Sequence, residues 1–120
     1  MNSRNLDIVE HILRYCDEIE EANSELGNSI ERLRSSSVYK NSVSMCILQI
    51  GELVGHLSND FKVTYSGMPW NDMRRMRNIA AHHYDKFDVD KLWETITEDI
   101  PALREYSKKI LSALETEQTD

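Results

Sequence analysis

Apolar side chains recur every three to four residues along most of the chain, which is the spacing of one face of an α-helix. The first such stripe, over 6–19, predicts a helix that ends before Gly27. Asn28 and, three residues later, Glu31 have the form of a capping box, which predicts a short second helix. The serine run 35–37 then predicts the end of that helix and the cap of the next one.

The longest apolar stripe, over 43–61, predicts a central helix of about five turns. Gly51 and Gly55 lie four residues apart on it, so they share a face and would let another backbone approach closely. A polar loop over 62–68 precedes a predicted fourth helix over 69–82, whose proline suits a first helical turn.

A last stripe, over 92–114, predicts a final helix with Asp88 or Asp90 as its cap. Pro101 lies inside this stripe and removes a backbone hydrogen bond, so one bent helix and two abutting helices both satisfy the pattern.

The chain as a whole has the size and composition of a single helical domain. Its length of 120 residues corresponds to about one domain, and 4 glycines and 2 prolines provide few turns. We find no alternation long enough for a strand. The sequence therefore predicts an all-α domain over 1–120, a compact antiparallel bundle of about five helices with its core at about 5–114 and a frayed tail at 115–120.

Charge and hydropathy exclude several classes of protein. With 14 Lys and Arg against 21 Asp and Glu the net charge is −7, so any nucleic-acid site must be local. No apolar stretch approaches the ~20 residues of a membrane span, and the N-terminal residues carry charges where a signal peptide needs an apolar core. These features predict a cytoplasmic protein. Cys16 and Cys46 lie among apolar residues and are expected as buried thiols.

Residues 74–84 concentrate three arginines, two of the four histidines, an asparagine and a tyrosine in this acidic chain. Arg74 and Arg77 share a helix face, whereas Arg77 and His82 differ by about 140° and converge only where the helix ends. Arginine suits the charge of a reacting RNA phosphate, and histidine suits proton transfer near neutral pH. A solvated basic helix face that ends in histidines explains the same pattern equally well.

Other candidate residues are weaker. His11 and His56 each stand alone on a helix and are expected as surface or packing residues. His82 and His83 are adjacent and lack the four-residue spacing that brings two metal ligands together on a helix. No metal site and no cofactor are therefore expected.

Four sequence blocks resemble one family in the same order and spacing. The motif block, RNIAAHHY, resembles the R-N-x-x-x-H-x-Y signature of the HepT-like branch of the HEPN superfamily, the toxin half of HEPN–MNT toxin–antitoxin systems. The other blocks are GELVGHLS, MPWNDMRRMRN and YDKFDVDKLWETITEDIPALRE, so the four lie between residues 51 and 105. The resemblance as a whole extends over roughly residues 5 to 114.

The resemblance implies an all-α bundle that forms a two-fold homodimer and acts as a metal-independent endoribonuclease on RNA. The catalytic residues carried over by position are Arg77, which would bind and stabilise the scissile phosphate, and His82, which would act as general base or acid. Asn78 would orient the histidine or the phosphate, and Arg74 would support substrate binding.

The implied partner is an MNT-type nucleotidyltransferase antitoxin that transfers AMP to the motif tyrosine, here Tyr84, which would also line the RNA site. This chain departs from the family at His83, where a small residue is common, so His83 competes with His82 for the catalytic role. The alternative hypothesis is a non-catalytic HEPN subunit that binds a nucleotide or a partner within a nucleotidyltransferase complex.

Overall fold

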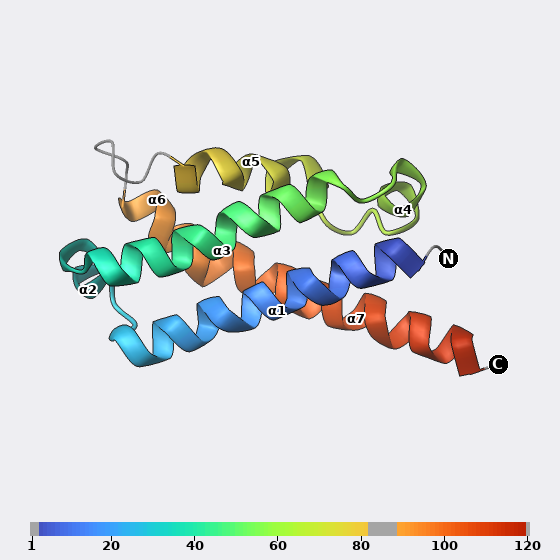
Figure 1. Cartoon of the computed structure of the whole chain (residues 1–120), viewed down its shortest axis with the longest axis horizontal. Helices are drawn as coiled ribbons and strands as arrows, with labels where there is room; N and C mark the ends of the chain where they lie inside the picture. Colours follow the sequence, from blue (N-terminus) through green and yellow to red (C-terminus); the bar gives the residue numbers. More distant parts are fainter. Residues whose placement is uncertain (1–2, 82–88, 120) are drawn as a thin grey trace.

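The computed structural model describes residues 3–81 and 89–119, and in these residues the chain is a bundle of helices joined by short turns (Figure 1). The elements in chain order are α1 (Ser3–Leu26), α2 (Ile30–Ser35), α3 (Ser37–Gly55), α4 (Asn59–Thr64), α5 (Trp70–Ala81), α6 (Val89–Glu94), the π-helical turn η1 (Thr95–Asp99) and α7 (Ile100–Thr119). The predicted all-α class is confirmed. None of the described helices combines the length and apolarity that crossing a bilayer requires.

The long helix α3 lies between α5 on one side and α1 on the other, and α1 packs in turn against α7 (Figure 1). The bundle is elongated, with principal extents of 50 × 25 × 19 Å. Its core consists of side chains from all four long helices, and the largest fully buried ones include Tyr39, Phe61, Ile12, Ile19, Leu33, Ile47, Ile50, Leu92, Ile96, Ile100, Leu103 and Ile110. At one end of the bundle α5 also meets α7, where the rings of Trp70 and Tyr106 lie 6.1 Å apart between centroids.

Both cysteines are buried in this core, as predicted. Burial, with a smaller contribution from the neighbouring Asp17 carboxylate, raises the pKa of the Cys16 thiol to about 12. Burial also raises the pKa of the Cys46 thiol to about 12, with help from Glu18, which lies 3.5 Å from its Sγ. Neither thiol is a ready nucleophile.

The predicted central helix over 43–61 is wrong at its end, because α3 stops at Gly55. The His56 N–H donates to the carbonyls of Leu53 and Val54, which closes the helix. Ser58 then begins α4 by accepting a hydrogen bond from the Phe61 N–H at 3.2 Å.

The cap of the second helix is also shifted by one residue from the prediction. Ser29 rather than Asn28 is the N-cap, and its Oγ accepts from the Arg32 N–H at 3.2 Å. Asn28 instead has a φ of +44°, a left-handed conformation in which it cannot begin a helix. The serine run does cap the next helix, since Ser36 accepts from the Tyr39 N–H at 3.1 Å.

The final helical segment decides between the two alternatives that Pro101 left open, because it is one continuous helical run rather than two separate helices. The chain runs from α6 through the π-helical η1 into α7, and Pro101 lies in the first turn of α7. The Ile100 N–H donates to the main-chain carbonyl of Thr95, five residues earlier. This spacing is that of a π-helical hydrogen bond. Asp88, one of the predicted caps, lies outside the described residues, and α7 continues to Thr119 through the segment expected as a tail.

Candidate active site

The two backbones of α3 and α5 come close together at Gly51. A Cβ atom added to Gly51 would lie 2.8 Å from the Cβ of Arg77 and 3.2 Å from the carbonyl oxygen of Arg74. Both distances are shorter than ordinary contact, so a side chain at this position would push the two helices apart. The predicted close approach of another backbone is confirmed at Gly51, and it places the basic helix α5 directly on α3.

Arg77 is held on α3 by an ion pair. Its Nε lies 2.6 Å from Oε1 of Glu52, the residue that follows Gly51. Each of the two side chains is more than half exposed, at 58% and 51% of its full surface. Because Glu52 occupies the Nε edge of the guanidinium, an incoming anion would meet the two terminal nitrogens.

Arg74 lies beside Arg77 on the same face, as the helical spacing predicts. Its Nε would be 3.3 Å from a Cβ at Gly55, so the second glycine makes room for the arginine side chain rather than for backbone. Arg74 and Arg77, with the two glycines, Glu52 and His56, line a small pocket of about 80 Å³. Two arginines against one carboxylate leave an excess of positive charge at this pocket.

The third arginine of the segment does not join this pocket. Arg75 forms an ion pair with Asp72 at 3.0 Å, on a part of α5 that faces away from the pocket. Three arginines lie close together in the sequence, and the structure divides them into a pair at the pocket and a separately neutralised residue. Asn78 is exposed on α5.

The remaining predicted site residues lie outside the described residues. These are His82, His83 and Tyr84, which follow directly after α5 ends at Ala81. Among the residues that the structure describes, no group of three or more His, Cys, Asp or Glu side chains is placed to hold a metal ion.

Two residues of the pocket were missed by the sequence interpretation. Glu52 received no role, and His56 was expected as a surface or packing residue, yet both line the pocket with the arginines. The available signal was helical spacing: positions 51, 52, 55 and 56 share one face, so the face marked by the glycines also carries a carboxylate and an imidazole. His11, by contrast, is exposed, and its Nδ1 lies 2.8 Å from the carbonyl oxygen of Asp7 on its own helix.

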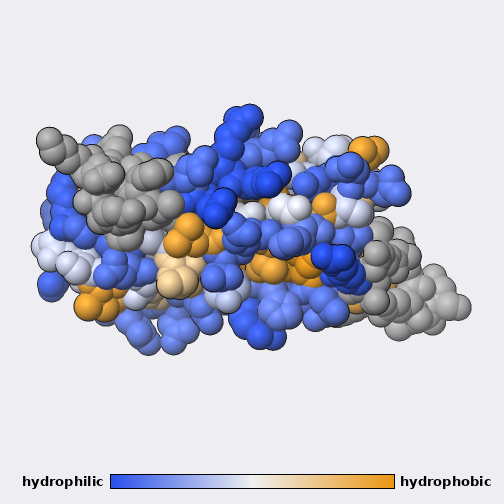
Figure 2. Space-filling model, turned by 45° about the horizontal axis from the view of Figure 1, so that its top comes forward, coloured by the Kyte–Doolittle hydropathy of each residue, from blue (hydrophilic) through white to orange (hydrophobic). Residues whose placement is uncertain are grey.

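The surface around this site is mainly hydrophilic. Figure 2 shows the side of the molecule toward α5, on which hydrophilic residues predominate and hydrophobic patches lie between them. Two of the exposed large hydrophobic residues belong to α3: Val38 at 65% and Met45 at 56% exposure. Val38, Met45 and Glu52 are spaced by seven residues, so both exposed apolar side chains lie on the side of α3 that carries Glu52.

Comparison with known proteins identifies one family. The family model described as "Ribonuclease HepT-like" matches residues 12–110. The "Probable ribonuclease HepT" of Thermococcus cleftensis is 33% identical over 110 residues, which cover 92% of this chain and 98% of that protein. A protein of Caldanaerobacter subterraneus subsp. tengcongensis named "Putative RNase" is 32% identical over 103 residues, which cover 86% of this chain and 90% of that protein. No solved structure was found to match the chain.

Proposed function

Because the chain belongs to the ribonuclease HepT-like family, we propose that the protein is a metal-independent endoribonuclease in which Arg77 and His82 carry the reaction. The observation that supports this most directly is the placement of Arg77. Close packing at Gly51 and the ion pair with Glu52 fix the base of its side chain and one edge of its guanidinium. A positioned, half-exposed guanidinium beside Arg74 suits the binding of an RNA phosphate.

The proposed reaction is transphosphorylation. The 2′-oxygen of a ribose attacks the adjacent phosphorus, the bond from phosphorus to the 5′-oxygen breaks, and a 2′,3′-cyclic phosphate forms. A general base takes the proton of the 2′-hydroxyl, and a general acid gives a proton to the departing 5′-oxygen. Arg77 stabilises the charge that develops on the phosphate, Asn78 orients the histidine or the phosphate, and His82 transfers protons, with His83 as the competing candidate.

A two-fold homodimer completes this site in the proposal. A single histidine would have to serve as both base and acid, whereas a dimer supplies two copies of His82 at one cleft. The exposed Val38 and Met45 support an interface along α3, because they lie on the same side of this helix as Glu52, which lines the arginine pocket. Pairing this side of α3 with its copy in a second chain would bring the two pockets near each other.

In a cell we place this enzyme in the cytoplasm as the toxin of a toxin–antitoxin pair, restrained by an MNT-type nucleotidyltransferase. That partner would transfer AMP from ATP to Tyr84: the phenolic oxygen attacks the α-phosphorus, pyrophosphate leaves and the phenolic proton is lost. The attached phosphate would add negative charge and bulk close to His82 in the sequence, which would oppose binding of RNA. Mass spectrometry after incubation with that transferase and ATP tests this step, and a chain without an adduct on Tyr84 contradicts it.

The ribonuclease itself is tested with labelled RNA in the presence of EDTA. Arg77→Ala should lower the cleavage rate about 100-fold or more, the loss typical of removing one charge-stabilising donor. Arg75→Ala is the matched control, because it removes the same charge from the same helix at a residue paired with Asp72. It should change the rate less than about threefold.

The histidines are separated by the same assay. Loss of cleavage in His82→Ala but not in His83→Ala, with cyclic-phosphate ends on the wild-type products, agrees with the proposal. A folded dimer that cleaves no RNA in any form would instead favour the binding subunit of a nucleotidyltransferase complex.

A further inference from the structure

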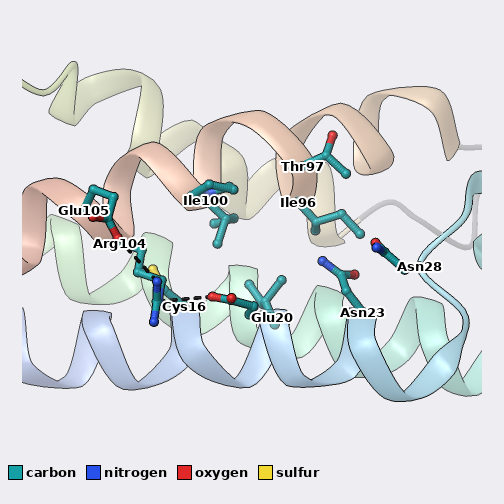
Figure 3. A pocket seen from close by; sticks show the side chains of 11 residues that line it. Cys16, Glu20, Asn23, Asn28, Ile96, Thr97, Ile100, Arg104 and Glu105 are labelled. Carbon is teal, nitrogen blue, oxygen red and sulfur yellow. Dashed lines mark hydrogen bonds and ion pairs between the residues drawn. The ribbon is translucent and has the colours of Figure 1, made fainter.

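A second pocket, of about 300 Å³, lies between α1 and the junction of η1 with α7. Figure 3 shows the side chains that line it. No residue of this pocket lines the arginine pocket, which lies between α3 and α5. Its floor is apolar, because Cys16, Ile19, Ile96 and Ile100 are all almost fully buried. A concave apolar floor with a few polar groups at its edge is the usual form of a binding site.

The π-turn forms one wall of this pocket. Ile96 and Thr97, both in η1, line it, and the wide turn displaces this wall from the path of a regular α-helix. The hydroxyl of Thr97 donates to the carbonyl of Trp93 at 2.7 Å, which helps to satisfy the backbone at the irregular turn. Single π-turns within helices are frequent at functional sites, and none of the roles proposed above uses this one.

One end of the pocket is ionic. The Nε of Arg104 lies 2.6 Å from a carboxylate oxygen of Asp17 and 3.1 Å from one of Glu20, and its Nη1 lies 3.3 Å from Glu105. Lys108 also approaches Glu105, at 3.4 Å. Three carboxylates thus face two cations, which leaves one negative charge in excess at this end of the pocket. Both pocket-lining carboxylates, Glu20 and Glu105, are 63% exposed.

The other end of the pocket carries amides. Asn23 and Asn28 lie there, across the isoleucine floor from the carboxylates (Figure 3). The Oδ1 of Asn23 accepts a hydrogen bond from the Tyr39 hydroxyl at 2.6 Å, so the orientation of this amide is fixed. Its nitrogen is then the group that can donate into the pocket, and a donor at this end calls for a carbonyl oxygen on the occupant.

We propose that this pocket is a docking site for a lysine residue of a partner protein. Its ammonium lies against Glu20 and Glu105, its four-carbon stem lies on Ile96 and Ile100, and its main-chain carbonyl accepts from Asn23. Lysine has this order of groups: a cation, an aliphatic stem and a neutral carbonyl. A free diamine fits less well, because its second ammonium would meet an amide end whose fixed group is a donor.

The test uses the isotopically labelled full chain and short peptides as probes. Acetyl-Ala-Lys-Ala-amide should shift the backbone amide NMR signals of Ile19, Asn23 and Ile96 in a saturable way, with a dissociation constant in the millimolar range. The double variant Glu20→Gln/Glu105→Gln should weaken binding about fivefold or more, the factor that corresponds to about 1 kcal/mol for a half-exposed ionic contact. Glu21→Gln is the matched control, an exposed neighbour that does not line the pocket, and it should leave the affinity unchanged.

Three results would overturn the proposal. Equal binding of the norleucine peptide would show that the cation plays no part, and equal binding of cadaverine would show that the occupant needs no carbonyl and is a free amine. The absence of saturable shifts at tens of millimolar peptide would exclude the site. The spectrum of each variant reports its fold directly, so a loss of binding cannot be confused with unfolding, and none of these readouts depends on ribonuclease activity.

Discussion

The contact of α5 with α3 predicts opposite effects for the same substitution at two glycines one turn apart. In Gly51→Ala the new methyl group would be about 0.6 Å closer to the Cβ of Arg77 than the 3.4 Å at which ordinary contact begins. It would also lie 3.2 Å from the carbonyl oxygen of Arg74, which belongs to the backbone and cannot rotate away. In Gly55→Ala the nearest atom is Nε of Arg74 at 3.3 Å, on a flexible side chain that can move.

The magnitudes follow from two opposing terms. Overpacking of a tight contact costs about 1–3 kcal/mol, and replacement of a helical glycine by alanine returns about 1 kcal/mol of helix propensity. Gly51→Ala should therefore destabilise the fold by about 0–2 kcal/mol. Gly55→Ala, at the last residue of α3, should be neutral or stabilising by up to about 1 kcal/mol. We expect Gly51→Ala to be about 1–2 kcal/mol less stable than Gly55→Ala.

Urea unfolding followed by circular dichroism measures this difference, with all proteins at one concentration because association would add to the apparent stability. The two variants are controls for each other, since they share the helix, the residue change and the gain in propensity. If Gly51→Ala were as stable as Gly55→Ala or more so, the backbones of α3 and α5 would not approach as described. RNA cleavage provides a second readout, because movement of α5 at Gly51 would displace Arg77.

Two further predictions concern Glu52 and the buried thiols. Glu52→Gln should change the free energy of unfolding by less than about 1 kcal/mol, because the ion pair is half exposed. The same substitution should nevertheless slow RNA cleavage about 10-fold to 100-fold, because Glu52 no longer holds the Arg77 guanidinium in place. An unchanged cleavage rate would contradict the positioning role of Glu52. The thiols of Cys16 and Cys46 ionise near pH 9.0 when unfolded and only near 12 when folded, so the free energy of unfolding should fall as the pH rises from 9 toward 12. Urea unfolding at several pH values should show a shallower fall in the Cys16→Ala/Cys46→Ala protein, and equal slopes would mean that the thiols ionise alike in both states.

The helical elements of this fold are predictable because each depends on a local repeat of apolar residues. The ends of the helices are less predictable, because they depend on which of two neighbouring residues acts as the cap and on contacts with residues distant in the sequence. Asn28 and Ser29 are both good caps, and the left-handed φ of Asn28 decides in favour of Ser29. Ser58 begins α4 and exchanges two hydrogen bonds with Asn5, at 3.1 and 3.2 Å, across 53 positions of sequence. No local pattern reveals that contact.

The candidate site divides in the same way. Helical spacing places Arg74 and Arg77 on one face, and the glycine spacing predicts a close neighbour, so both halves of the contact are visible in the sequence. The spacing cannot show that the glycine face of α3 packs against the arginine face of α5. This packing pairs Glu52 with Arg77 and makes His56 part of the pocket. The sequence also cannot show that Arg75 pairs with Asp72, because this ion pair depends on side-chain geometry.

The geometry of the ion pair also predicts that the proposed reaction depends on arginine at position 77 and not merely on a positive charge. Glu52 takes the Nε edge of the Arg77 guanidinium, so one planar group can contact the carboxylate and present its terminal nitrogens to a phosphate. A lysine ammonium is a single point, so in Arg77→Lys the carboxylate and the phosphate would compete for it. We expect Arg77→Lys to keep the fold within about 0.5 kcal/mol, as for most exposed substitutions, and to lose most of the RNA cleavage. Arg75→Lys is its control and should cleave at the wild-type rate. If Arg77→Lys also retained that rate, the site would use only the charge, and the held guanidinium would have no part in catalysis.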